Sequence, residues 1–127
     1  MDVRYECTAV CGVGRIGVPQ FIRAMTRRTT RPFDRRGLTL DGCAAFPEGR
    51  GGAEATVKVK ARLYLKDAAS EAASNPGELL ERAMREVIQE AAEMAAATVT
   101  VKSVAVIEGT TTEAYRARAE AELERNF

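Results

Sequence analysis

The chain has 127 residues, 46% of them hydrophobic and 29% charged, with 19 basic and 18 acidic side chains and no histidine. This composition is typical of one globular domain with enough chain for a hydrophobic core. Without histidine, acid–base catalysis would depend on carboxylates, and none of them converge, so we expect a non-enzymatic protein. No apolar run approaches the ~20 residues that span a bilayer, and the first residues lack signal-peptide character. We therefore expect no membrane partner and a cytoplasmic location, or one within an assembled particle.

The first predicted strand covers residues 3–11, where apolar side chains alternate with mostly polar ones. Period two indicates a strand with one buried face. Cys7 and Cys11 lie on that face, about 13 Å apart on an extended chain, too far for a disulfide or one shared metal ion. We expect both thiols, and Cys43, to be reduced and inert, with no metal or cofactor, and a redox or metal role as the alternative. The apolar face of this strand consists of Val3, Tyr5, Cys7, Ala9 and Cys11.

A glycine-rich turn, Gly12-Val-Gly-Arg-Ile-Gly17, separates this strand from a short predicted helix that contains Val18, Phe21, Ile22 and Met25. The spacing matches the dinucleotide-binding pattern, in which glycines let the backbone approach a pyrophosphate at a helix N-terminus. Gly12, Gly14 and Gly17 are therefore candidate cofactor-binding residues, with Asp41 as the acidic residue that would hold the ribose. Polar residues along the preceding strand, and Pro19 after the glycines, favour instead a tight strand-to-helix turn.

Six arginines and one acidic residue, Asp34, occupy residues 23–36. Residues 1–66 contain 13 basic and 6 acidic side chains, whereas residues 67–127 contain 6 basic and 12 acidic ones. The net charge of +1 therefore conceals two halves of opposite sign. The arginine cluster is a candidate surface for phosphate or for an acidic protein partner, and it consists of Arg23, Arg27, Arg28, Arg31, Arg35 and Arg36.

Two further strands are predicted to form a hairpin. The first covers residues 38–45, and residues 46–52 (Phe-Pro-Glu-Gly-Arg-Gly-Gly) have the composition of a turn. Residues 55–65 then alternate strictly, with valine, alanine and leucine on one face and Lys58, Lys60, Arg62 and Tyr64 on the other. A parallel strand covered on both faces would be apolar throughout, so these charges predict an antiparallel sheet with one solvated, basic face.

A long amphipathic helix is predicted after Asn75, whose side chain can cap it, with Pro76 in its first turn and Glu78 three residues beyond the cap. Glu78 with Arg82, and Glu81 with Arg85, are spaced for ion pairs on the solvent side. The apolar positions recur at steps of three and four, and they are Leu79, Leu80, Ala83, Met84, Val87, Ile88, Ala91 and Met94.

The last predicted strand covers residues 98–108 and changes phase near Ser103 and Val104, which indicates a bulge or a strand end covered on both sides. The resulting order, strand, helix, strand, strand, helix, strand, predicts a ferredoxin-like βαββαβ α+β sandwich with its helices on one face of the sheet, over residues 1–109. Thr110 and Glu113 form a second capping box, which predicts an amphipathic helix over residues 110–127. Its apolar stripe, a candidate for docking on the domain or on a neighbouring subunit, is Tyr115, Ala119, Leu123 and Phe127.

These features support three functional hypotheses. The first is a structural, non-enzymatic protein that acts through self-association or docking into a larger complex, such as a virion, with the arginine cluster of one subunit facing Glu120, Glu122 and Glu124 of the next. The second is a nucleic-acid-binding module that uses the same arginines on phosphates, although the sheet offers only Tyr64 for stacking on bases. The third is nucleotide binding at the glycine-rich turn.

Overall fold

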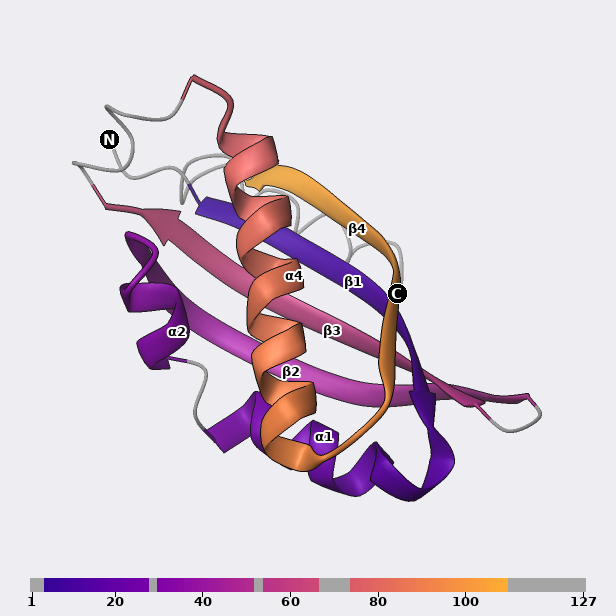
Figure 1. Cartoon of the computed structure of the whole chain (residues 1–127). Coiled ribbons are helices and arrows are strands. Elements are labelled where there is room, and N and C mark those ends of the chain that lie inside the picture. Colours follow the sequence, from indigo (N-terminus) through magenta and orange to yellow (C-terminus); the bar gives the residue numbers. More distant parts are fainter. Residues whose placement is uncertain (1–3, 28–29, 52–53, 67–73, 110–127) are drawn as a thin grey trace, which may run out of the picture.

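The computed structural model describes residues 4–27, 30–51, 54–66 and 74–109, and the helix predicted for residues 110–127 lies outside them. Figure 1 shows the elements in chain order. They are β1 (Arg4–Gly14), a 3-10 turn (Arg15–Gly17), α1 (Val18–Arg27), α2 (Thr30–Asp34), β2 (Leu38–Gly51), β3 (Glu54–Leu65), α4 (Pro76–Ala95) and β4 (Val99–Gly109).

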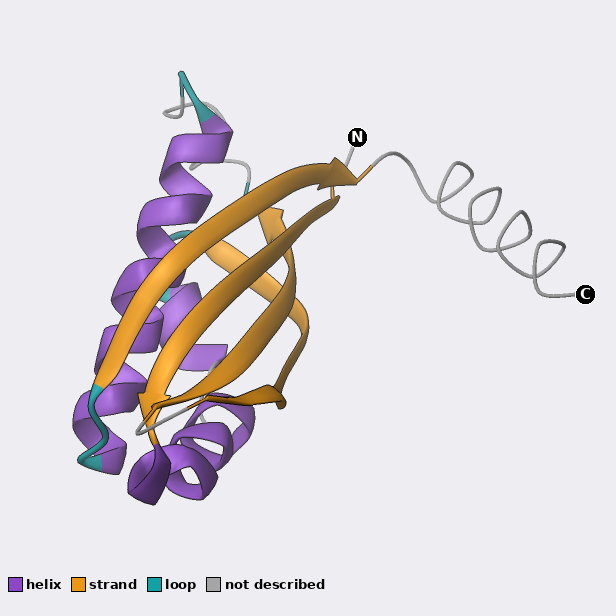
Figure 2. Cartoon of the chain, turned by 90° about the vertical axis from the view of Figure 1, so that its right-hand side faces the viewer, coloured by secondary structure: helices purple, strands orange, loops and turns teal. Residues whose placement is uncertain are grey.

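The four strands form one sheet in the order β2-β3-β1-β4, and each neighbouring pair is antiparallel. The helices cover one face of this sheet, as Figure 2 shows from the side. The prediction of a ferredoxin-like α+β fold is therefore confirmed. β2 and β4 are the two edge strands of the described sheet.

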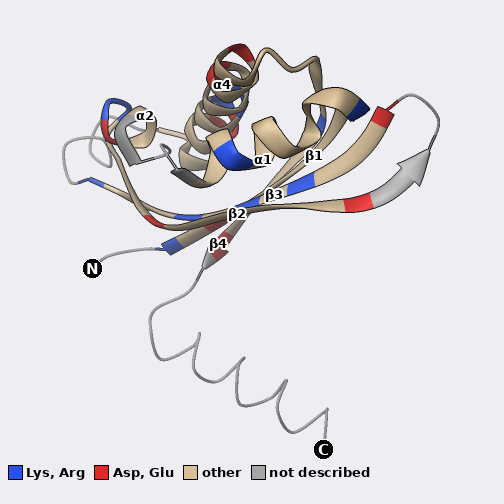
Figure 3. Ribbon diagram, turned by 90° about the horizontal axis from the view of Figure 1, so that it is seen from below, with Lys and Arg blue, Asp and Glu red and all other residues tan. Residues whose placement is uncertain are grey.

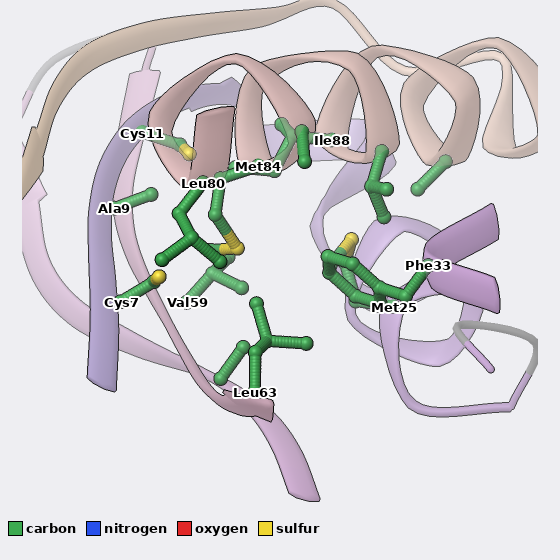
Figure 4. Packing of buried hydrophobic residues seen from close by; sticks show 14 of the residues in the cluster. Cys7, Ala9, Cys11, Met25, Phe33, Val59, Leu63, Leu80, Met84 and Ile88 are labelled. Carbon is green, nitrogen blue, oxygen red and sulfur yellow. The ribbon is translucent and has the colours of Figure 1, made fainter. Parts of the chain in front are cut away.

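The core lies between the sheet and the helices (Figure 4). β1 contributes Tyr5, Cys7, Ala9, Cys11 and Val13, and β3 contributes Val57, Val59, Ala61 and Leu63, all of them buried. The predicted alternation of both strands is thus confirmed wherever their residues are described. The polar residues between these positions lie on the opposite face of the sheet, which carries no described helix; we call it the open face.

α4 begins as predicted, because the Asn75 side chain accepts a hydrogen bond of 3.2 Å from the Glu78 backbone N–H. The helix ends at Ala95, and its C-cap Ala96 has a positive φ of 51°, which turns the chain toward β4. One expectation was wrong: Met94 is 57% exposed instead of facing the core. It lies on the same face of the helix as the buried Ala83, but in the last turn, where α4 extends beyond the core.

One prediction about the middle of the chain needs correction, and one helix there was not predicted. Residues 46–51, predicted as a turn, belong to β2, which reaches Gly51 because it accommodates two bulges, at Asp41 and Glu48. The arginine-rich segment contains the short helix α2, whose Phe33 is fully buried.

The predicted irregularity of the last strand is confirmed as a bulge at Lys102, between the positions that pair with Cys11 and Val10.

Candidate interaction surfaces

The arginine segment is partly used inside the molecule. The Arg36 guanidinium contacts Glu86 at 2.7 Å and Glu90 at 2.8 Å, and it donates a third hydrogen bond of 2.7 Å to the Pro32 carbonyl. Arg35 lies 3.5 Å from Glu90. Burial alone would lower the pKa of Arg36, but its hydrogen bonds to Glu90 and Glu86, together with their charges, outweigh burial and raise it. Arg36 therefore connects the segment after α2 to the solvent side of α4.

Of the other members of the arginine cluster, the structure describes the side chains of Arg23 and Arg35. Arg23 is exposed on α1. The side chains of Arg27, Arg28 and Arg31 lie outside the described part of the chain, as do the glutamates proposed as their counterparts and the apolar stripe of residues 115–127. A single arginine surface therefore stays a prediction.

The glycine-rich turn is shaped by contacts within the chain. A Cβ atom on Gly17 would lie 2.6 Å from the Ala97 Cβ, and one on Gly12 would lie 2.7 Å from the Glu54 carboxylate. The Gly14 N–H donates a 3.0 Å hydrogen bond to the Thr98 carbonyl. The end of the turn therefore packs against the connection between α4 and β4, and close packing explains Gly17, whereas the atoms near Gly12 are the ends of the exposed Glu54 and Lys102 side chains.

Asp41 lies far from this turn. It forms an ion pair of 3.4 Å with Arg4, at the opposite end of β1 from Gly14. An eleven-residue strand spans roughly 30 Å. The acidic residue of the dinucleotide-binding pattern is therefore not beside the glycines, and nucleotide binding stays a prediction without that element.

The cysteines of β1 face the core as expected. Cys7 and Cys11 are 1% and 0% exposed. Burial raises the pKa of the Cys7 thiol to about 12 and that of Cys11 to about 11, so both are protonated at neutral pH. Among the described residues, no group of three or more potential ligands gathers that could hold a metal ion.

The open face carries the basic residues predicted for β3, accompanied by carboxylates on neighbouring segments. Figure 3 marks the charged positions along the strands. Lys58 lies 2.7 Å from Glu48, and Arg62 lies 3.9 Å from Glu6. Lys102 of β4 lies 3.8 Å from Glu54. Most described cations of this face thus have an acidic neighbour, and its described charges nearly balance.

The open face also has two aromatic side chains instead of one. Tyr64 accepts a 2.8 Å hydrogen bond from Arg4, whose guanidinium lies 5.3 Å from the ring centre. Phe46 is 38% exposed, and the Lys60 ammonium lies 5.8 Å from its ring centre. Phe46 was predicted to lie in a turn, but it belongs to β2 and pairs with Lys58 of β3.

A hollow of about 370 Å³ lies on this face, between β2, β3 and β1. It forms because Gly42 and Ala44 of β2 stand beside Arg62 and Lys60 of β3, so that small residues adjoin long ones. We call it the Gly42 hollow, and its other lining side chains include Glu6, Thr8 and Asp41.

The two edges of the sheet differ in regularity. β2 is interrupted by two bulges, contains Pro47 and packs against α1 and α2. β4 has one bulge, at Lys102, and from Ser103 to Gly109 it stays in regular register with β1. Its segment Ser103–Glu108 contains no proline or glycine, and Ile107 is 52% exposed. No described strand pairs with its outer side.

Comparisons with known proteins support the fold and nothing more specific. No family model and no curated protein matches the sequence. Among solved structures, the full extracellular region of zebrafish Gpr126/Adgrg6 aligns with 84% of this chain, over 13% of its own length, at 16% identity and a TM-score of 0.53. The C-terminal domain of MgtC from Mycobacterium tuberculosis aligns over 84% of this chain and 87% of that domain, at 15% identity and a TM-score of 0.45.

A dimeric ferredoxin-like protein from an uncultured marine organism covers 86% of this chain and 97% of its own, again at 15% identity and a TM-score of 0.45. Likenesses at these identities show the fold alone. Among the described residues, no helix has the length and hydropathy required to cross a bilayer.

Proposed function

We propose that this protein is a non-catalytic subunit that self-associates, with β4 of one copy pairing antiparallel with β4 of a second copy. The observation that carries the proposal is the regular segment Ser103–Glu108 at the edge of the sheet, with which no described strand pairs on its outer side. An edge strand presents unpaired backbone N–H and C=O groups, and a long apolar one is a template for another strand. A second copy would satisfy these groups.

Symmetry restricts how the two strands can meet. A two-fold axis makes both copies use the same patch. Suppose that the helices of both copies lie on the same side of the joined sheet, so that the two-fold axis is perpendicular to the sheet. Residues directly opposite each other must then point to the same face of the sheet. This holds only if the axis passes between one residue of β4 and the same residue of the second copy. With the axis at Ala105, Ile107 lies opposite Ser103; with the axis at Val106, it lies opposite Ala105.

The side chains of β4 suit this contact. Val104 and Val106 already pack partly against the core, while Ala105 and Ile107 are exposed on the open face. Pairing would add apolar neighbours to both sets of residues. The segment is only about 20 Å long, so we expect an interface at the small end of the range and a dissociation constant near micromolar.

The charges of the described residues favour this proposal over nucleic-acid binding. Arg36, Lys58 and Lys102 each have a carboxylate within ion-pair distance, and a phosphate would have to compete with it. Four exposed cations have no ion pair among the described residues, and no element carries more than one of them. They are Arg15, Arg23, Lys60 and Arg82. No single described element therefore presents the row of free cations that the nucleic-acid alternative needs.

Sedimentation velocity over a dilution series, at low and high salt, tests the proposal. Edge pairing depends on backbone hydrogen bonds and apolar contacts, so we expect a dimer that persists at high salt. A multimer that dissociates as salt rises would favour the arginine-to-glutamate contact instead. A chain that stays monomeric but retards DNA or RNA in a gel would favour the nucleic-acid alternative.

A further inference from the structure

The Gly42 hollow lies on the open face and is lined by residues of β2, β3 and β1, and by none of β4. We propose that it is a binding site for a small organic carboxylate, with the carboxylate group at Lys60 and Thr8 and the apolar body over Gly42 and Ala44. The site needs no second copy and stands independently of the proposed function.

The charges around the hollow favour an anion. Asp41 is paired with Arg4 at 3.4 Å, and Glu6 with Arg62 at 3.9 Å. Lys60 makes no ion pair with any described residue, and its ammonium rests instead against the ring of Phe46 at 5.8 Å. One positive charge at the hollow therefore lacks a counter-ion among the described residues.

Thr8 supplies a second polar group. It lies directly opposite Lys60 in the pairing of β1 with β3, where Cβ atoms are about 5 Å apart. Its hydroxyl can donate to a carboxylate oxygen while the Lys60 ammonium contacts the same group. A charge-assisted pair of donors of this kind is suited to a carboxylate.

Gly42 shapes the apolar part of the site. A Cβ atom placed on it would find no atom within 4 Å, and its φ lies outside the left-handed range. Neither the backbone nor internal packing therefore requires glycine here, in contrast to Gly17. Together with Ala44, it leaves a trough of about 370 Å³, near the lower end of the volumes of small-molecule pockets.

The test is a titration of the full-length protein with butyrate at constant ionic strength, followed by amide chemical shifts in ¹H–¹⁵N NMR spectra. We expect saturable shifts centred on Gly42, Ala44 and Thr8. The variant K60Q removes the charge and G42V fills the trough, and each should weaken binding at least tenfold with the fold retained. The matched variant K66Q, which removes a lysine paired with Asp34, should bind as the wild type does.

Several results would overturn the site. They are shifts that do not saturate, K60Q or G42V variants that bind butyrate as well as K66Q does, and equal binding of butylammonium. Inorganic phosphate that binds as tightly as butyrate would overturn the carboxylate assignment. In sedimentation velocity, K60Q and G42V should self-associate as the wild type does, which separates the site from the proposed dimer.

Discussion

The two edge strands of the sheet, β2 and β4, differ in how regular their backbones are. β2 contains Pro47 and bulges at Asp41 and Glu48, and α1 and α2 pack against it. β4 is regular beyond Lys102 and exposes Ile107. Prolines, bulges and covering elements are features by which proteins prevent strands from pairing at an edge. Helices pack against both strands, but β2 has a proline and two bulges, whereas the second half of β4 has neither among the described residues.

The difference indicates which edge is available to a partner. Both strands have the same number of neighbours in the sheet, one each, so position alone does not distinguish them. The difference lies in the outward-facing backbone N–H and C=O groups. They repeat without interruption along the second half of β4, whereas bulges interrupt them along β2. Substitutions on β4 and β2 test whether that regularity decides association, and substitutions at Gly17, Arg36 and Cys7 test the packing that supports the sheet.

Placing lysines on β4 should have the largest effect. In A105K/I107K, either two-fold register sets like charges directly opposite each other across the junction. We expect the dissociation constant of the dimer to rise at least 100-fold, or about 2.7 kcal/mol, as measured by sedimentation equilibrium. The I107K change should not disturb the fold, because Ile107 lies opposite Glu6 in the pairing of β4 with β1.

The control for this variant is T39K/Q89K, which adds the same two charges to the β2 edge and to the exposed side of α4. It should associate as the wild type does. Equal weakening in both variants would show that net charge, and not the β4 edge, controls association.

Filling the space beside the start of β4 should destabilise the fold. In G17V, the new side chain would overlap Ala97, whose Cβ is 2.6 Å from a Cβ at position 17. Overpacking of this kind costs about 1–3 kcal/mol of unfolding free energy, measured by urea denaturation. G42V, at a glycine with open space, should change it by less than about 0.5 kcal/mol. A tolerated G17V would mean that this corner adjusts freely.

Removing the Arg36 guanidinium should lower the free energy of unfolding. R36M keeps the aliphatic stem but loses the contacts to Glu86 and Glu90, which are partly solvated. We expect a loss of about 1 kcal/mol in urea denaturation. R23M, at an exposed position of α1, should lie within about 0.5 kcal/mol of the wild type. Equal stability of both variants would assign the Arg36 contacts no net contribution.

High pH should destabilise the hydrophobic core, because Cys7 of the central strand β1 is buried in it. The pKa of Cys7 is about 12 in the folded state against 9.0 for the unperturbed thiol. Because the folded state holds this proton more tightly, its contribution to stability is complete below pH 9 and is lost as pH rises from there toward 12. Urea denaturation should show a smaller decline over this range for C7A than for the wild type. Parallel pH profiles would contradict the shifted pKa.

Making β2 more regular should have the smallest effect. Proline in an edge strand is found where its missing N–H would face solvent. P47V restores that donor, but the bulge at Glu48 still interrupts the register. We expect only a trace of species larger than the dimer in sedimentation velocity. Extensive assembly of P47V would mean that the proline alone blocks this edge.

Much of the fold could be predicted from the sequence. Strict alternation in β1 and β3 and the cap at Asn75 are local signals, and all three are confirmed by burial and hydrogen bonding. β2 was underestimated because Pro47 and its neighbouring glycines resemble a turn, and only pairing with β3 shows that bulges accommodate them. Met94 was misplaced because periodicity does not show where a helix extends beyond the core.

The candidate surfaces were harder to predict. The arginine-rich segment appeared to be one solvated surface, but Phe33 anchors it in the core and Arg36 pairs with α4, contacts between residues far apart in sequence. The Gly42 hollow depends on the register of three strands, which alternation does not specify. A single glycine in a weak strand was the only local sign, and it indicates a bulge as readily as a cavity.

Concentration-dependent amide hydrogen exchange tests the central claim most directly. As the protein is concentrated from a monomer to a dimer, alternate amides within Ser103–Glu108 should gain protection, because their outward N–H groups become hydrogen-bonded. Amides of β2 should exchange at the same rate throughout. A dimer that forms without added protection in β4, or with protection in β2 instead, would contradict the proposed edge pairing.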